Sequence, residues 1–134
     1  MSSTPAKVTH LESNDMQKAR AFSPAVISEG GRTVWLAGQT TTVDLEGKDI
    51  SGNFEAQAHA CFAMIDRTLQ RLGGSLANLV TMTVFINDPR YGDAFVKLRA
   101  GKFEPGKYPA SALLTVTAFA RPGILIEIQG VAVI

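Results

Sequence analysis

Glu127 stands out because it is an acid inside the most apolar stretch of the chain. The run from Ile124 to Val133 is rich in isoleucine and valine, which predicts a strand. Side chains alternate along a strand, so the isoleucines of this run face one way, and Glu127 faces the other way with Leu125 and Gln129. Removing a carboxylate from water is costly, so Glu127 must have a partner, a wet site or a proton. We therefore take Glu127 as the candidate chemical centre, with an ordinary solvent-facing strand position as the alternative.

A cysteine and a histidine, two further residues able to do chemistry, fall in one predicted helix. Asn53 is a favourable N-cap and Gly73-Gly74 a favourable stop, and apolar residues recur between them every three or four positions. Cys61 lies on that apolar stripe, which favours a small core residue over a catalytic thiol. His59 lies off the stripe, which favours a surface residue over a base. A single cysteine excludes an intramolecular disulfide, and no Cys/His cluster has metal-ligand spacing, so we expect neither a metal nor a cofactor.

The other predicted elements are five strands and a second helix. Val26–Ser28 and Thr33–Gln39 are predicted to pair as a hairpin around a glycine-bearing turn. Leu79–Asn87 alternates with apolar residues on both faces, so both faces are expected to be at least partly covered. The remaining elements are strands at Val8–Leu11 and Ala112–Ala118 and a helix at Tyr91–Phe103. This order of elements predicts an α+β fold whose helices pack on one face of a sheet.

Length and charge set the broad class. We expect a single domain over residues 1–134, in which residues 1–20 form an N-terminal tail and loop apart from the short strand. The net charge is +1 and the lysines and arginines are scattered, so no basic stripe suggests nucleic-acid binding. No apolar run approaches the roughly 20 residues of a membrane-spanning helix, and the polar N-terminus carries no secretory signal. We therefore expect a cytoplasmic protein that binds neither nucleic acid nor membranes.

Several short motifs resemble, in their order and spacing, those of the Rid (YjgF/RidA-like) family. They are Ala21–Val26, the Ala37–Gln39 strand end, Gln57, Thr81–Asp88, Tyr108–Ser111 and Ile126–Val133. The resemblance runs nearly end to end, and no single motif decides it. It implies a chorismate-mutase-like fold, in which three chains form a homotrimer around a central β-barrel with the helices outside. It also implies that ligand sites lie at the subunit interfaces.

The resemblance further implies hydrolysis of reactive enamines and imines, which releases ammonia and a keto acid. In deaminating members a glutamate of the last strand positions or activates the attacking water, and Glu127 matches it. Gly38 and Gln39 match the strand at the edge of the pocket. An arginine directly after Pro-Ala binds the substrate carboxylate in those members, and Ser111 stands in its place here. Phe22 likewise stands for a tyrosine that lines the pocket, which makes the expected cavity more apolar.

Two arginines could replace the missing carboxylate anchor. Arg99 falls in the second helix, near a position where deaminating members often carry asparagine, and Arg121 lies in the turn before the last strand. Each could instead be a solvated surface arginine. The predicted ligand-binding residues are therefore Phe22, Gly38, Gln39, Arg99, Ser111 and Arg121, around Glu127 as the catalytic residue.

The function predicted first is hydrolysis or deamination of an enamine, an imine or a related unsaturated carboxylic metabolite at a subunit-interface pocket. Ser111 argues against a standard 2-iminobutanoate deaminase, because serine cannot imitate a bidentate cationic anchor. The alternative is a non-catalytic trimer that binds a small metabolite. RNA cleavage has also been attached to the family, but the sequence carries neither a basic patch nor a His/Lys/Arg cluster to support it.

Overall fold

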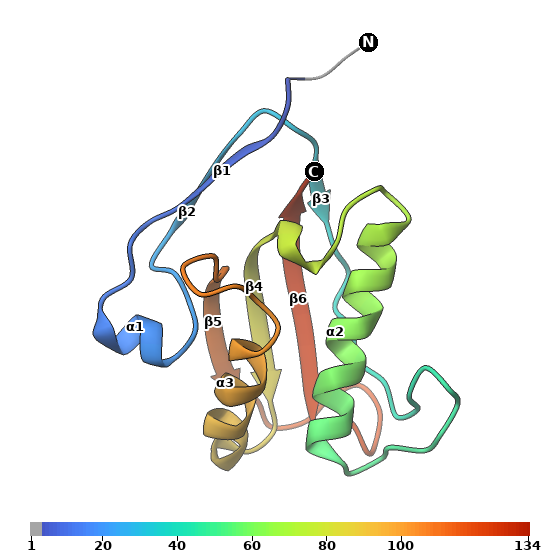
Figure 1. Ribbon diagram of the computed structural model, residues 1–134. Coiled ribbons are helices and arrows are strands. Elements are labelled where there is room, and N and C mark those ends of the chain that lie inside the picture. Colours follow the sequence, from blue (N-terminus) through green and yellow to red (C-terminus); the bar gives the residue numbers. More distant parts are fainter. Residues whose placement is uncertain (1–3) are drawn as a thin grey trace.

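The computed structural model describes residues 4–134 and shows a four-stranded sheet with two helices on one face (Figure 1). The sheet contains β3 (Thr33–Trp35), β4 (Leu79–Ile86), β5 (Ala110–Thr115) and β6 (Ile126–Val133), and the helices are α2 (Phe54–Gln70) and α3 (Gly92–Ala100). Short 3-10 turns, η1 (Leu76–Asn78) and η2 (Pro89–Tyr91), lead into β4 and α3. An N-terminal arm holds β1 (Lys7–His10), α1 (Asp15–Ala19) and β2 (Val26–Glu29). The predicted α+β fold with helices on one sheet face is confirmed.

The strand order is β3-β6-β4-β5, with β6 antiparallel to both neighbours and β5 parallel to β4. A parallel pair needs a crossover connection, which α3 supplies. The predicted hairpin is wrong, because β2 pairs with β1 and β3 pairs with β6. Gly30 and Gly31 both have positive φ. The backbone after them pairs with the C-terminal end of the chain and not with β2, since the Arg32 N–H donates to the Ile134 carbonyl at 2.7 Å. The turn therefore sends the chain from one sheet into another.

The core lies between the sheet and α2. Asn53 caps the helix as predicted, with its side chain accepting from the Ala56 N–H. The apolar stripe of α2 is buried as far as Leu69 and packs on the isoleucine face of β6, so Ile126 and Ile128 are fully buried. Leu72, which continues the sequence pattern, is exposed because the helix has already ended. Cys61 is buried and His59 is exposed, as their positions relative to the stripe predict.

One irregularity in β4 changes its alternation. Leu79 pairs with Ala132 and Thr81 with Val131, so the register shifts by one residue between them. Such a bulge turns Leu79 toward the core, where it is buried with Met82 and Val84, instead of onto the opposite face with Thr81. Beyond the bulge the predicted alternation holds.

The N-terminal arm is more ordered than predicted. Residues 12–20 look like a polar loop in the sequence, but α1 lies within them. The Asn14 side chain accepts from the Gln17 N–H and the Gln17 side chain accepts from the Asn14 N–H, each at 2.9 Å. This reciprocal capping box stabilises a helix too short to show an apolar period. No helix within residues 4–134 is long and apolar enough to cross a membrane.

Candidate functional site

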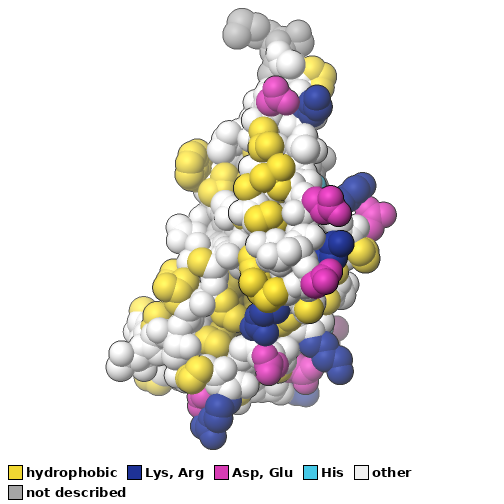
Figure 2. Space-filling view, turned by 90° about the vertical axis from the view of Figure 1, so that its left-hand side faces the viewer, with side chains coloured by type: hydrophobic (Ala, Val, Ile, Leu, Met, Phe, Trp, Pro, Cys, Tyr) yellow, Lys and Arg dark blue, Asp and Glu magenta, His cyan; other side chains and the backbone are white. Residues whose placement is uncertain are grey.

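Glu127 lies on the face of the sheet that the helices leave uncovered. The register places three groups of side chains on this face: Phe85 and two threonines from β4, Leu114 from β5 and Trp35 from β3. Among the β3–β6 residues that point this way, Glu127 is the only charged one. In Figure 2 charged side chains gather on the side that carries the helices, whereas the side over the sheet shows mainly hydrophobic and uncharged groups. The acid therefore stands alone on an uncharged surface.

Glu127 lines a hollow of about 210 Å³. We call it the Glu127 hollow; its other lining residues are apolar, namely Phe85, Val116, Ala118, Phe119 and Ala120. Phe85 is the direct cross-strand partner of Glu127. No lysine or arginine forms an ion pair with Glu127 within residues 4–134. A half-buried carboxylate with an apolar wall and no cation partner is an available proton acceptor.

Gly38 approaches the Glu127 carboxylate more closely than any other residue type could. The segment after β3 continues along β6 as far as a bridge between Gln39 and Ile128. Three residues lie between Trp35 and Gln39, whereas two lie between their partners Val131 and Ile128, so the edge bulges here. A Cβ at Gly38 would lie against Oε2 of Glu127 and 3.0 Å from its Cδ, so any side chain would displace the carboxylate.

Cys61 supports the same edge from the core side. Its Sγ donates to the Gln39 carbonyl at 3.2 Å, which ties the Gly38-Gln39 segment to α2. Burial raises the pKa of the Cys61 thiol to about 12, and the negative charge of Glu127 adds to the effect. The thiol is therefore neutral at ordinary pH, which suits a structural hydrogen bond and excludes a thiolate nucleophile.

Ser111 and Arg99 meet each other on the opposite, helix-covered side of the sheet. Ser111 is the register partner of the buried Met82, and its Oγ accepts a 2.6 Å hydrogen bond from Nη1 of Arg99. Arg99 is only 2% exposed, and its Nη2 donates to the Arg20 carbonyl at 2.8 Å. Burial, then the charge of Arg20, lowers the Arg99 pKa to about 10. Arg99 is thus neither a solvated surface residue nor directed toward the Glu127 hollow.

The remaining predicted residues lie apart from this pair. Phe22 is half-buried in the arm, where its carbonyl accepts from the Ser13 hydroxyl at 3.0 Å. Arg121 is exposed and directly follows Ala120 of the Glu127 hollow. The structure therefore brings Glu127, Gly38 and Gln39 together. Arg121 is adjacent in sequence to a residue that lines the hollow. Phe22, Arg99 and Ser111 lie away from Glu127.

Sequence reasoning missed the apolar lining of the Glu127 hollow. Phe85 could have been found, because the alternation of the strand at residues 79–87 places it with the threonines on the face away from the core. Phe119 and Ala120 belong to an irregular connection, and no periodic pattern predicts where such a segment lies. Residues 4–134 contain no group of His, Cys, Asp and Glu side chains that could hold a metal ion.

Comparison with known families adds an independent finding. Residues 12–134 match the sequence model described as Endoribonuclease L-PSP. No protein with a curated description is similar enough in sequence to match the chain.

Solved structures share the fold over nearly the whole length. YyfB of Yersinia pestis, a protein of unknown function of the conserved Rid family, is 25% identical with a TM-score of 0.81, over 96% of this chain and 98% of its own. RidA of an Antarctic Psychrobacter is 30% identical with a TM-score of 0.66, over 84% of this chain and 88% of its own. Rv2704 of Mycobacterium tuberculosis, a member of the YjgF/YER057c/UK114 family, is 26% identical with a TM-score of 0.60, over 97% of this chain and 100% of its own.

The match of 123 residues to the family model, the 30% identity to a RidA and the shared fold agree with one another. The chain belongs to the Endoribonuclease L-PSP family, the family of the YjgF/Rid proteins.

Proposed function

We propose that this protein is a small-molecule hydrolase or deaminase that acts on an enamine, an imine or a related unsaturated carboxylic metabolite, with Glu127 as its catalytic residue. The observation that carries the proposal is the placement of Glu127. It is the one acid on an otherwise uncharged sheet face, it has an apolar hollow beside it, and no cation neutralises it within residues 4–134.

The proposed reaction needs only a positioned base and a water molecule. Glu127 accepts a proton from water while the water oxygen bonds to the carbon of the C=N group, and Glu127 then passes this proton to the nitrogen, which gives a carbinolamine. In the second step Glu127 takes the proton of the carbinolamine hydroxyl and gives it to the nitrogen. The C=O bond forms as the C–N bond breaks, so a carbonyl compound and ammonia leave and Glu127 is again ionised. The Gly38 edge holds the carboxylate in place, because its missing Cβ leaves room for the Glu127 oxygens.

Substrate choice follows from the positions of the arginines. Arg99 is buried and bonded to Ser111 and to the Arg20 carbonyl, so it is not free to bind a ligand carboxylate. Arg121 is exposed beside the rim, and we assign to it the role of carboxylate anchor if the substrate is an acid. We therefore expect ordinary 2-imino acids, such as 2-iminobutanoate, to be poor substrates.

The Glu127 hollow is open in a single chain, and an interface would close it. The surrounding face exposes Trp35 at 79% and Leu114 at 43%, so a second chain could bury apolar surface here. We propose that a homotrimer covers this face and completes the pocket. A second chain would also remove water from around the bound imine, which strengthens the electrostatic interactions of the carboxylate.

Ammonia release tests the proposal. A panel of enamines and imines, generated in place by an amino-acid oxidase or a dehydratase, is offered to the native protein and to Glu127→Gln. Loss of a general base predicts a fall of about 10²–10⁴-fold with little change in stability. Glu46→Gln, in an exposed loop, is the matched control and should keep full activity.

Two results would count against catalysis by Glu127. If Glu127→Gln melts several degrees lower while turnover is unchanged, the residue is structural. If the native protein binds panel compounds without releasing ammonia, and Glu127→Gln abolishes that binding, the protein is a metabolite-binding trimer. The family description also names an endoribonuclease, but the hollow contains no His, Lys or Arg to act on RNA.

A further inference from the structure

A second and larger hollow lies away from Glu127, between the N-terminal arm and the loop before β5. Its volume is about 510 Å³, within the range of small-ligand sites. We call it the arm hollow, and the residues that matter for its chemistry are His10, Glu12, Ser13, Lys18, Pro105 and Tyr108. None of them belongs to the Glu127 hollow or to the predicted ligand-binding residues.

The two walls of the arm hollow are tied to each other through Ser23. The Ser23 hydroxyl donates to the Tyr108 carbonyl at 2.6 Å, and its N–H donates to the Pro109 carbonyl at 3.1 Å. On the other wall, Ser13 Oγ donates to the Phe22 carbonyl at 3.0 Å. Ser23 itself is only 2% exposed, so these bonds are protected from water. The hollow is therefore preformed, which lowers the entropic cost of binding.

The loop that forms the second wall has a fixed shape. Pro105 and Gly106 occupy the centre of a turn closed by the Lys107 N–H donating to the Glu104 carbonyl at 2.9 Å, and Gly106 has φ +83°. Proline followed by a glycine with positive φ is the pattern of a type II turn. This turn presents the proline ring next to the half-buried Tyr108, so one part of the hollow has a flat apolar wall.

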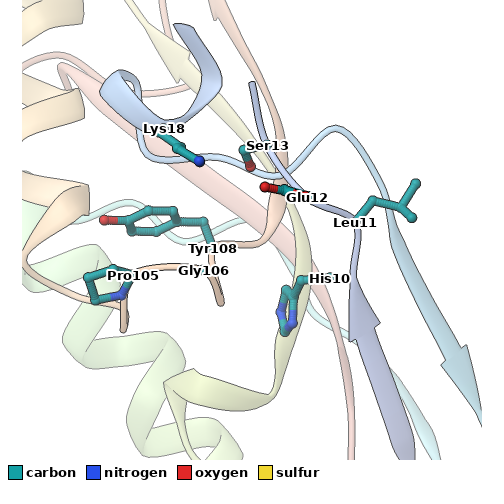
Figure 3. A pocket seen from close by; sticks show the side chains of 8 residues that line it. All are labelled: His10, Leu11, Glu12, Ser13, Lys18, Pro105, Gly106 and Tyr108. Atoms are coloured by element: carbon teal, nitrogen blue, oxygen red, sulfur yellow. The ribbon is translucent and has the colours of Figure 1, made fainter. Parts of the chain in front are cut away.

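Two opposite charges enter the hollow without neutralising each other. Figure 3 shows the ends of Lys18 and Glu12 directed into the space above the Tyr108 ring, whereas Leu11 points away. Neither Lys18 nor Glu12 has an ion-pair partner within residues 4–134. A simple carboxylate would leave Glu12 unpaired, and a simple amine would leave Lys18 unpaired. Both side chains are exposed and solvated by water, so a ligand that carries both charges offers each of them a partner at once.

We propose that the arm hollow binds a free α-amino acid with an aromatic side chain. Its carboxylate bonds to Lys18, its ammonium group to Glu12, and its side chain packs on Tyr108 and Pro105. Aromatic rings gain from offset or edge contacts with a tyrosine ring, which favours an aromatic side chain over a small one. The site is separate from the proposed reaction at Glu127 and does not depend on it.

Titration of the ¹⁵N-labelled full chain with L-phenylalanine, followed by NMR, tests the proposal. Saturable shifts are expected for the backbone amides of residues 10–13 and 106–108. Phenethylamine lacks the carboxylate and 3-phenylpropionate lacks the ammonium group, so each should bind about tenfold more weakly, the effect of one lost charged hydrogen bond.

Variants then assign each charge. Glu12→Gln should weaken L-phenylalanine about tenfold and leave 3-phenylpropionate unchanged, whereas Lys18→Met should weaken L-phenylalanine equally and leave phenethylamine unchanged. Glu46→Gln and Lys48→Met, in an exposed loop, are charge-matched controls with no expected effect, and Glu127→Gln should also have none. The proposal is overturned if L-phenylalanine gives no saturable shifts at millimolar concentration, or if Glu127→Gln abolishes binding while Glu12→Gln and Lys18→Met do not.

Discussion

Gln57 ties the loop before α2 to the turn that leads into β6, so its replacement should destabilise the fold. It is fully buried in α2. Its Nε2 donates to the carbonyls of Ile50 at 3.0 Å and Gly123 at 2.7 Å, and its Oε1 accepts from the Leu125 N–H at 2.8 Å. These bonds fix the loop before α2 and the turn that leads into β6.

The cost of losing the Gln57 amide follows from what each partner keeps. The Ile50 carbonyl still accepts from the Asn53 N–H at 3.1 Å, and the Gly123 carbonyl from the Gly52 N–H at 3.2 Å. Only the Leu125 N–H is left without a partner, at about 1–3 kcal/mol, and two further bonds add roughly 0.5–1.5 kcal/mol each. Gln57→Met, which keeps the volume, should therefore lower the free energy of unfolding by about 2–6 kcal/mol.

Gln57→Glu separates shape from hydrogen bonding. The introduced carboxylate can still accept from Leu125, but its second oxygen would face two carbonyl oxygens, so the protonated form is favoured and the pKa of this new carboxyl group rises in the folded state. At a pH near the ordinary glutamate pKa, the free energy of unfolding of the variant should approach that of the native protein. As the pH rises, it should decrease relative to the native value by up to about 1.4 kcal/mol per pH unit.

Urea unfolding at one fixed protein concentration, at pH 4.5 and 7.5, measures both effects, because assembly makes stability depend on concentration. Gln70→Met is the matched control on the same helix, where the Gln70 side chain is exposed and bonds only to Asp66 in residues 4–134. It should change stability by less than about 0.5 kcal/mol. A Gln57→Met variant as stable as the native protein, or a Gln57→Glu variant with no extra pH dependence, would refute the reasoning.

Two further predictions concern assembly and the buried thiol. The protein should be a homotrimer by light scattering at micromolar concentration, and Trp35→Glu should yield a monomer, because Trp35 is the largest exposed apolar group on the open sheet face; a stable native monomer would contradict the interface pocket. Cys61 should resist alkylation at pH 8, and stability should fall as the pH rises from about 9 toward 12, because the unfolded thiol loses its proton there while the folded one keeps it. Cys61→Ala should flatten that alkaline fall, and equal pH profiles for the two proteins would argue against the raised pKa.

The sequence pattern was sufficient for the elements whose burial is periodic. The alternation around Ile126 and Ile128 and the stripe of α2 predicted the core correctly, because both record the face that packs inward. It failed where pairing depends on partners distant in the chain. β3 pairs with β6 through backbone hydrogen bonds, and no local sequence pattern predicts that pairing. The short helix α1 is stabilised by one pair of capping side chains, Asn14 and Gln17.

The candidate site was predictable in part for the same reason. Glu127 and Gly38 were singled out by type and by resemblance, and the fold brings them into contact. The role of Arg99 was not predictable, because its helical position is compatible with either a surface or a pocket. Its burial depends on the Arg20 carbonyl, which the arm delivers from 79 residues away in sequence.

Ser111 and Arg99 are best understood as one unit, because the position after Pro-Ala cannot hold an arginine while Arg99 is present. The half-buried Ser111 has its Oγ 2.6 Å from the guanidinium of the buried Arg99, so an arginine at 111 would bring a second cation next to it. At about 4 Å two like charges repel by roughly 4 kcal/mol at an effective dielectric constant of 20. Ser111→Arg alone should therefore destabilise the fold, and so should Arg99→Asn, which leaves the Arg20 carbonyl without its 2.8 Å partner.

The double variant should recover part of this loss, because the new guanidinium takes the space and the charge that the old one vacates. In a double-mutant cycle of unfolding free energies, we expect it to be more stable than the sum of the single effects by about 1–3 kcal/mol. Additivity within about 0.5 kcal/mol would show that the two positions are independent. A coupling of that size would mean that the two positions share one cation site, from which Arg99 ties the N-terminal arm to the sheet.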